Sequence, residues 1–412
     1  MLRFRLGLLF CAALVLSFVV SAHAADLGKV LFVRFAGDPE NGPADVYEKN
    51  LNTDATKLLI SHKSLPKSFQ TRIDSVNPSP DGRFVVLNES PGWIIRDGKT
   101  GKSRVMFGYG FSYSGDEELS GEIGGGRWCW ERKTGAVKQI RKGVGLEHVG
   151  MAWSPKGDYL LITETTDGSF NTDSAPEGSI QIYNPVSGKS IHFNSINNLG
   201  IAEWSGKGDG VIEVTYSSKS ISTVLFQPIT GKRKMLFSWP RPISNIAQSP
   251  DGTTFAIFDD KGYYLTNSKG KNIKTLRIPR QEECFSVNLC FNRSGSHLAI
   301  STYYCFGEPH INETDQLWSV DVKKASVKRI VEWNECLQGS GTAVNRSVIG
   351  WLPDDKSIAV EGSICYGEEM PAEMRNNWSI LWRYNMLTPT GKGQKLFDSD
   401  KGCLGIGYCP GK

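Results

Sequence analysis

A short turn followed by an apolar run recurs along most of this 412-residue chain. Its clearest form is Ser-Pro-Asp-Gly, in which proline presets the backbone for the turn, aspartate caps it locally and glycine tolerates positive φ. The apolar run after each turn indicates a strand that is buried on both faces. The aligned turn positions are Gly82, Glu117, Gly157, Gly208, Gly252, Gly295 and Asp355.

The spacing of these turns predicts the architecture. Successive turns lie 35, 40, 51, 44, 43 and 60 residues apart. Repeats of about 40–50 residues are typical of β-propellers, in which each repeat forms one blade of four strands. A second pair of apolar segments around a tight turn follows in each unit, as in "IQIYNPVSGKSIHF", and such a pattern is typical of a hairpin. We therefore predict four antiparallel strands in each unit, and we refer to them as the first to the fourth strand in chain order.

A column of large side chains precedes the turns. Five of its seven members are aromatic, and a ring at this position can fill the gap between neighbouring blades. The members are Pro78, Tyr113, Trp153, Trp204, Gln248, Phe291 and Trp351.

The two ends of the repeat region predict how the ring closes. The segment that begins "KVLFVRF" resembles the second, third and fourth strands of a blade that lacks its first strand. The heptapeptide Cys403–Cys409 can supply that strand, which would remove an exposed sheet edge. We therefore predict an all-β propeller of eight four-stranded blades, closed by the N- and C-terminal strands. Seven blades is the alternative, if the short unit at residues 108–141 is not a true blade.

The first 24 residues have the order of a secretory signal peptide. Arg3 and Arg5 precede an apolar run from Leu6 to Val20, and Ala22-His23-Ala24 forms a small-residue cleavage site. We expect cleavage after Ala24 and one propeller domain over residues 25–412. The mature protein is then periplasmic or secreted and has no transmembrane segment.

Charge gives little indication of a polyanionic partner. Removing residues 1–24 takes away two arginines, which leaves 45 basic against 43 acidic residues. A nearly neutral chain predicts no nucleic-acid partner. Basic turn residues such as Lys232, Arg233 and Lys234 are expected to be solvated hairpin charges.

The repeat, and especially the segments "VLFVR", "ADVYEKNL" and "TKLLIS", resembles that of TolB-type periplasmic β-propellers. The resemblance covers nearly all of residues 28–400 and implies a propeller fold. This chain departs from TolB in lacking an N-terminal α/β domain and in having more blades. Unrelated functions share this architecture, so the resemblance predicts the fold rather than the partner.

Few residues in the sequence suggest catalysis. The five histidines after residue 24 lie in different units at no metal-ligand spacing, and no Gly-x-Ser-x-Gly motif is present. We expect no cofactor, no metal and no catalytic residues. The leading hypothesis is a non-enzymatic propeller that binds a protein, peptide or glycan in the cell envelope. The alternatives are a propeller lyase or hydrolase with an acidic central site, and a structural subunit of an envelope complex.

Two long connections between second and third strands carry similar sequences, "YYCFGEPHINETDQLWSV" and "SICYGEEMPAEMRNNWSILWRY". Long loops on a rigid scaffold are frequent carriers of function, although the sequence favours a structural role for these two, as loops held by cysteine. The candidate ligand-binding residues are Tyr304, Phe306, Glu308, His310, Tyr366, Glu368 and Glu369.

Eight cysteines remain after residue 24, an even number that fits disulfides in an exported chain. Cys284 and Cys336 precede the first strands of the last two units, whereas Cys305 and Cys365 follow the second strands. These two kinds of connection share one face of a propeller. We therefore predict the disulfides Cys284–Cys305 and Cys336–Cys365, which would pin the two long connections.

Overall fold

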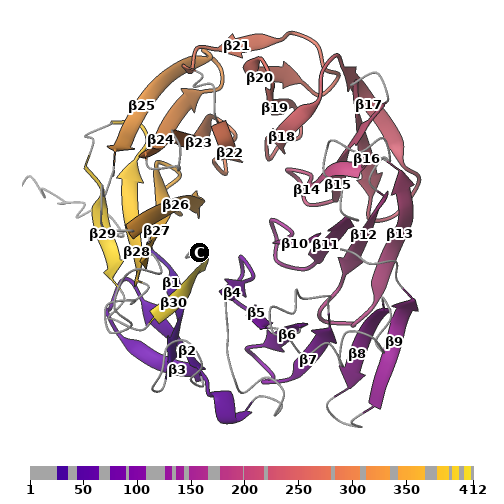
Figure 1. Ribbon diagram of the computed structural model, residues 1–412, viewed down its shortest axis with the longest axis vertical. Coiled ribbons are helices and arrows are strands. Elements are labelled where there is room, and N and C mark those ends of the chain that lie inside the picture. The colour runs from indigo at the N-terminus through magenta and orange to yellow at the C-terminus, as the bar shows by residue number, and fades with distance from the viewer. Residues whose placement is uncertain are drawn as a thin grey trace, which may run out of the picture.

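A computed structural model shows a closed ring of seven antiparallel sheets around a central opening (Figure 1). The residues that the structure describes are 26–35, 44–64, 75–89, 92–107, 126–131, 136–142, 148–165, 177–197, 199–217, 221–279, 284–306, 312–334, 342–366, 378–388, 392–398 and 403–409. Within each sheet the first strand is innermost, and the chain runs outward to the fourth (Figure 1).

The blades are numbered from the N-terminus. Blade one contains β30 (Cys403–Cys409), β1 (Lys29–Phe35), β2 (Ala44–Asn50) and β3 (Thr56–Ile60), which the short helix η1 (His62–Ser64) follows. Blade two contains β4 (Ser75–Pro78), β5 (Phe84–Glu89), β6 (Gly92–Asp97), β7 (Ser103–Phe107), β8 (Gly126–Glu131) and β9 (Ala136–Lys142). Blade three contains β10 (His148–Trp153), β11 (Leu160–Thr165), β12 (Glu177–Tyr183) and β13 (Ser190–Asn197).

The remaining four blades have four strands each. Blade four contains β14 (Leu199–Trp204), β15 (Gly210–Tyr216), β16 (Ser222–Pro228) and β17 (Lys234–Trp239). Blade five contains β18 (Ile243–Gln248), β19 (Thr254–Asp259), β20 (Gly262–Asn267) and β21 (Lys274–Leu276). Blade six contains β22 (Cys284–Phe291), β23 (His297–Phe306), β24 (Asn312–Asp321) and β25 (Ser326–Asn334). Blade seven contains β26 (Thr342–Trp351), β27 (Ser357–Tyr366), β28 (Trp378–Asn385) and β29 (Gln394–Asp398).

The prediction of eight blades is wrong, and the alternative of seven is confirmed. The short unit at residues 108–141 contains β8 and all but the last residue of β9, and β8 pairs with β7. The unit therefore lengthens the outer edge of blade two to six strands and takes no place of its own in the ring. Blades two and three are direct neighbours, because the Trp153 indole Nε1 donates a hydrogen bond of 3.1 Å to the Asn77 carbonyl oxygen.

The predicted closure of the ring is confirmed. Strand β30 pairs antiparallel with β1 from Lys29 opposite Cys409 to Arg34 opposite Cys403. The two ends of the chain thus share blade one, and β1 has a partner on each side.

The repeated turn has one geometry around the ring. The aligned residues Gly82, Gly157, Gly208, Gly252 and Gly295 have φ between 67° and 76°, a conformation that glycine adopts without strain. A buried serine begins most of these turns, and in blade five the Ser249 hydroxyl oxygen accepts a hydrogen bond of 3.0 Å from the Thr254 backbone N–H. Glu117, the remaining member of the column, lies outside the described residues.

The aromatic column joins successive blades, as predicted. The indole Nε1 of Trp204 donates to the Ala152 carbonyl oxygen at 2.9 Å, and that of Trp351 donates to the Cys290 carbonyl oxygen at 2.9 Å. Each tryptophan therefore reaches the innermost strand of the preceding blade. Between blades, the cores consist of buried aliphatic and aromatic side chains from both facing sheets, such as Phe84 and Ile162 between blades two and three.

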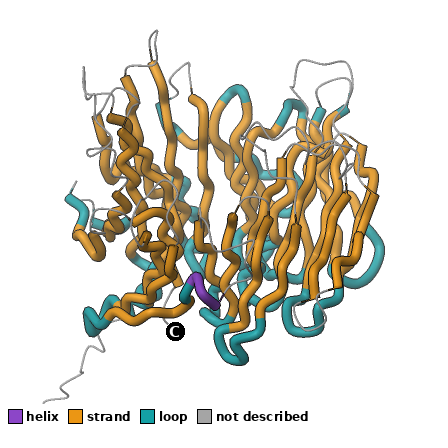
Figure 2. The backbone as a smooth tube through the Cα atoms, turned by 60° about the horizontal axis from the view of Figure 1, so that its bottom comes forward, coloured by secondary structure: helices purple, strands orange, loops and turns teal. Residues whose placement is uncertain are grey.

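The blade topology fixes two faces of the ring. In blades two to seven the turn between the first and second strands and the turn between the third and fourth strands lie at the same end, because the strands are antiparallel. In blade one, whose first two strands are the two ends of the chain, the turn between the third and fourth strands lies at this end. We call this end the turn face, and the opposite end the loop face. Figure 2 shows the strands running between these two faces.

Candidate functional site

At the loop face, the second strands of blades six and seven extend further than that of blade five. Strand β23 ends eleven residues after Gly295 and β27 ends eleven residues after Asp355, whereas β19 ends seven residues after Gly252. Four further residues at about 3.3 Å each raise the end of the strand by about 13 Å. We call these extensions the wall. Its segments are Tyr303–Phe306 with Asn312–Asp315 in blade six, and Ser363–Tyr366 with Trp378–Ser379 in blade seven.

Three of the seven candidate binding residues lie on the wall. Tyr304 and Phe306 lie on β23 and Tyr366 lies on β27, the second strands of adjacent blades. The sequence analysis assigned these residues to loops, but they belong to extended strands. Glu308, His310, Glu368 and Glu369 lie outside the described residues.

The base of the wall is packed. Thr302 and Gln316 are buried, and the Gln316 side-chain oxygen accepts a hydrogen bond of 3.2 Å from the Trp318 indole Nε1. In blade seven, the Trp382 ring crosses Gly362 so closely that a Cβ atom at Gly362 would lie 2.4 Å from the ring. These contacts support the wall from below.

The predicted disulfides stay predictions. Cys284 is the first residue of β22, and its partner across the strand pair is Tyr304, the residue before Cys305. The strand register shifts between Cys284 and Ser286. A disulfide needs Cβ atoms about 3.8 Å apart, so the Cys284–Cys305 bond depends on this register shift. In the second pair, Cys365 lies on β27 and Cys336 is outside the described residues.

The other cysteines do not form an evident site. Cys290 is a free thiol on β22, and burial raises its pKa to about 11, so it is a poor nucleophile at neutral pH. Cys403 and Cys409 lie at opposite ends of the single strand β30. Cys129 lies on β8.

The connection between the second and third strands of blade five is short, since β19 ends at Asp259 and β20 begins at Gly262. The Asp259 carboxylate is fully buried and accepts hydrogen bonds from the Trp239 indole Nε1 at 2.8 Å and the Arg241 Nε at 2.7 Å. It also accepts from the backbone N–H groups of Lys261 and Gly262. This carboxylate holds the short connection of blade five against the preceding blade, and its bonds leave little capacity for a ligand.

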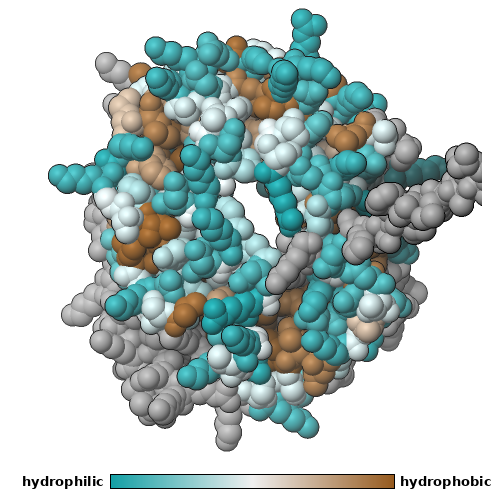
Figure 3. Space-filling model, turned by 180° about the vertical axis from the view of Figure 1, so that it is seen from behind, coloured by the Kyte–Doolittle hydropathy of each residue, from teal (hydrophilic) through white to brown (hydrophobic). Residues whose placement is uncertain are grey.

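One carboxyl group stands out on the innermost strands that the structure describes. Of the seven innermost strands, only β14 carries an acidic residue, Glu203. Its side chain is exposed and borders the channel, whose opening Figure 3 shows at the centre of the ring. Protein surrounds the carboxyl although water still reaches it, and this desolvation raises the pKa of Glu203 from 4.5 to about 7.

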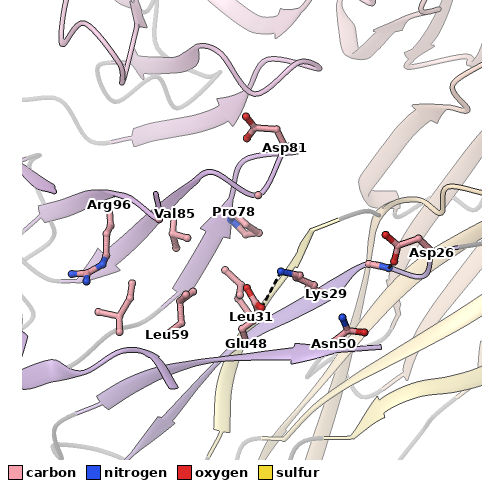
Figure 4. Close-up of a pocket in the computed structure, with 14 residues that line it drawn as sticks. Asp26, Lys29, Leu31, Glu48, Asn50, Leu59, Pro78, Asp81, Val85 and Arg96 are labelled. Atoms are coloured by element: carbon pink, nitrogen blue, oxygen red, sulfur yellow. Dashed lines mark hydrogen bonds and ion pairs between the residues drawn. The ribbon is translucent and has the colours of Figure 1, made fainter. Parts of the chain in front are cut away.

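A cavity of about 320 Å³ lies between blades one and two at the turn face (Figure 4). Its walls carry both signs of charge, and the Lys29 ammonium lies 3.0 Å from the Glu48 carboxylate inside it. Asp26 and Asp81 also accept hydrogen bonds from within their own turns. The sequence did not indicate this cavity, because the residues that line it come from two blades.

The described residues contain neither a metal centre nor a spanning helix. No group of three or more His, Cys, Asp or Glu side chains among them could hold a metal ion. In the same part of the chain, no helix is long and apolar enough to cross a membrane.

Comparison with known proteins finds distant likenesses to solved structures. No family model and no curated protein matches the chain. Among solved structures, the chain is similar to TolB from Acinetobacter baumannii, with 15% identity and a TM-score of 0.36 over 73% of this chain and 63% of TolB. An oligogalacturonate lyase in complex with manganese shows 12% identity and a TM-score of 0.45, over 90% of this chain and 86% of the lyase.

A third similar structure is the acylaminoacyl peptidase of Pyrococcus horikoshii. It shows 12% identity and a TM-score of 0.47, over 90% of this chain and 51% of the peptidase. Likenesses at this level of identity assign no function to this chain.

Proposed function

We propose that this chain is an exported, non-enzymatic β-propeller that binds a protein, peptide or glycan partner through the wall. The observation that carries the proposal is the four-residue extension of the second strands in blades six and seven relative to blade five. Backbone held in paired strands loses less conformational entropy on binding than a free loop would.

The sequence of the wall suits recognition. Five aromatic residues lie in three of its four short segments: Tyr303, Tyr304, Phe306, Tyr366 and Trp378. Tyrosine and tryptophan are enriched at binding hot spots, because a large ring with a polar group gives much contact area with few rotatable bonds.

Capture from a cell-envelope extract tests this proposal. The full chain is immobilised beside the double variant Phe306→Ser/Tyr366→Ser, and bound proteins and glycans are identified. We expect a stoichiometric partner that the wall variant loses by at least about tenfold, the effect of 1.4 kcal/mol. The control is Met235→Ser/Ile273→Ser, which changes two exposed apolar residues away from the wall.

The enzymatic alternative has its own readout in the same samples. Turnover of a panel of glycans and peptides by the purified chain, together with no captured partner, would favour a lyase or hydrolase. Loss of that turnover in Glu203→Gln would assign it to the channel.

Export is part of the proposal and is tested separately. The signal segment lies outside the described residues. We expect the mature protein to begin Ala-Asp-Leu-Gly, as cleavage after Ala24 requires. N-terminal sequencing of the protein from an envelope fraction decides this, and an intact Met1 there would overturn the export proposal.

The disulfides are proposed to hold the wall to the first strands. Non-reducing peptide mapping is expected to show Cys284 linked to Cys305 and Cys336 linked to Cys365. Each bond closes a loop of 20–30 residues and could add about 3 kcal/mol to stability in the chain-entropy model. Other pairings, or free thiols at these positions, would remove the disulfides from the proposed function.

A further inference from the structure

Basic residues gather in one class of turn. The seven turns between third and fourth strands contain ten lysines and arginines among their described residues and a single acid, Asp54. The six described turns between first and second strands contain five basic and six acidic residues. The ten basic residues are all exposed, and they are Lys99, Lys102, Lys189, Lys232, Arg233, Lys269, Lys271, Lys323, Lys324 and Lys392.

Blades four to six concentrate this charge. Together with the first basic residues of the following strands, they form what we call the basic arc. Its members are Lys232, Arg233, Lys234, Lys269, Lys271, Lys274, Lys323, Lys324 and Lys328. The Lys274 ammonium donates a hydrogen bond of 2.9 Å to the Lys323 carbonyl oxygen, which joins the basic turns of blades five and six.

Acidic neighbours neutralise little of the arc. Asp321 lies 3.3 Å from the Lys324 ammonium, and the buried Glu213 carboxylate pairs with Arg233. By contrast, the ammonium groups of Lys232, Lys269, Lys271 and Lys323 make no ion pair with any residue that the structure describes. Cations at this density repel one another, so an anionic partner would relieve the repulsion.

Exposed apolar side chains accompany the basic turns. Of the six large hydrophobic residues that stand exposed among the described residues, five lie in a third-to-fourth turn or on a fourth strand. Each is within three residues of a lysine in the sequence. Their exposed fractions are 51% for Leu58, 55% for Val186, 37% for Ile191, 58% for Met235 and 52% for Ile273. On the face in Figure 3, apolar patches lie between projecting hydrophilic side chains around the ring.

We propose that the turn face docks on an anionic phospholipid bilayer through the basic arc. The third-to-fourth turns occupy one end of a rigid ring, so several can meet a plane at once. Lysines attract the anionic headgroups, and single apolar side chains between them can enter the headgroup boundary. An acidic protein or nucleic acid would also attract the charge. It would not explain isolated apolar residues that alternate with lysines and form no groove.

Vesicle cosedimentation tests the proposal. The full chain is mixed at low salt with vesicles of phosphatidylcholine alone or with added phosphatidylglycerol. We expect binding to the anionic vesicles alone and its loss as salt rises. A lysine beside an anionic surface contributes about fivefold in affinity, so Lys271→Gln/Lys323→Gln should weaken binding about 25-fold. The matched control, Lys261→Gln/Arg277→Gln, removes two exposed cations from the connections of the loop face. It should change vesicle binding less than about twofold.

A second variant distinguishes the bilayer from other polyanions. Met235→Ser/Ile273→Ser should weaken vesicle binding at least several-fold and leave binding to soluble polyglutamate unchanged. An unchanged melting temperature in each variant shows that the ring is intact. The proposal is overturned if anionic vesicles do not bind, if both charge variants weaken binding equally, or if polyglutamate binds and vesicles do not.

Discussion

Asp355 replaces the turn glycine of the repeat in blade seven and makes contacts that glycine cannot make. It has φ of 55° at the position where glycine closes the turn in five other blades. Its carboxylate accepts hydrogen bonds from the Arg293 backbone N–H at 2.7 Å and the Ser294 backbone N–H at 3.3 Å. The side chain therefore joins the turn of blade seven to that of blade six, which glycine could not do.

This role predicts the order of two substitutions. Asp355→Gly relieves the positive φ, worth up to about 1 kcal/mol, but loses two backbone partners worth about 1 kcal/mol each. We expect a net loss of about 1 kcal/mol. Asp355→Asn keeps an acceptor oxygen and tolerates positive φ, so it should lose less. Urea denaturation measures both, and a glycine variant as stable as the parent would exclude the inter-blade role.

Glu203 predicts a pH dependence. Its pKa in the folded protein is raised from 4.5 to about 7, so ionisation opposes folding. Stability from this group is fully present below pH 4.5 and is lost as pH rises towards 7. Because water reaches the exposed carboxyl, we expect the effect on stability to be no more than about 1 kcal/mol.

Glu203→Gln removes this dependence. The variant should match the parent in stability at pH 4 and exceed it at pH 8, as measured by chemical denaturation at both pH values. An NMR titration of the Glu203 carboxyl carbon gives the pKa directly. A midpoint at or below 4.5 would show that channel water solvates the carboxylate fully.

At the scale of elements, the repeat predicted the strands well and the number of blades less well. The turn glycines, the tryptophan bridges and the pairing of β30 with β1 all follow from local patterns that one blade carries within itself. The pattern of β8 and β9 is equally that of a hairpin. A hairpin extends a blade when it pairs with the outer strand of that blade, and the hairpin pattern alone does not show this pairing. The sequence contained one indication that this unit is not a blade, namely Glu117 at the position where most units have the turn glycine.

The sequence predicted the location of the candidate site in blades six and seven, but it did not predict that the site is built from extended strands. Similar sequences marked the connections of blades six and seven, and the structure puts both at one end of neighbouring blades. Their strand character was missed because Cys-aromatic-Gly-Glu contains a turn signal directly after β-forming residues. The cavity between blades one and two and the charge of the turn face require the strand register, since each combines residues from separate repeats.

The closing strand predicts a test at this scale. Deletion of residues 401–412 removes β30 and leaves one edge of β1 unpaired from Lys29 to Arg34. We expect a loss of at least about 3 kcal/mol in stability, together with aggregation through the open edge. Thermal melting and light scattering measure the two effects. Unchanged melting and solubility after the deletion would show that another strand closes the ring.

For the whole molecule, the two proposed surfaces lie on opposite faces of one ring. The wall rises from the loop face of blades six and seven, whereas the basic arc lies on the turn face of blades four to six. A propeller docked by the arc would hold the wall away from the bilayer, where a soluble partner can reach it. The net charge of the chain did not indicate the basic arc. The 47 basic and 43 acidic residues nearly cancel when they are summed over the whole chain.

Separate faces predict that the two binding activities are independent. Phe306→Ser/Tyr366→Ser should abolish partner capture and leave binding to phosphatidylglycerol vesicles unchanged. Lys271→Gln/Lys323→Gln should do the reverse. Vesicles that carry the parent protein should still capture the partner with an affinity within about threefold of that in solution, which is less than 1 kcal/mol of coupling. If vesicles and partner exclude each other, the two surfaces overlap and the assignment of faces is wrong.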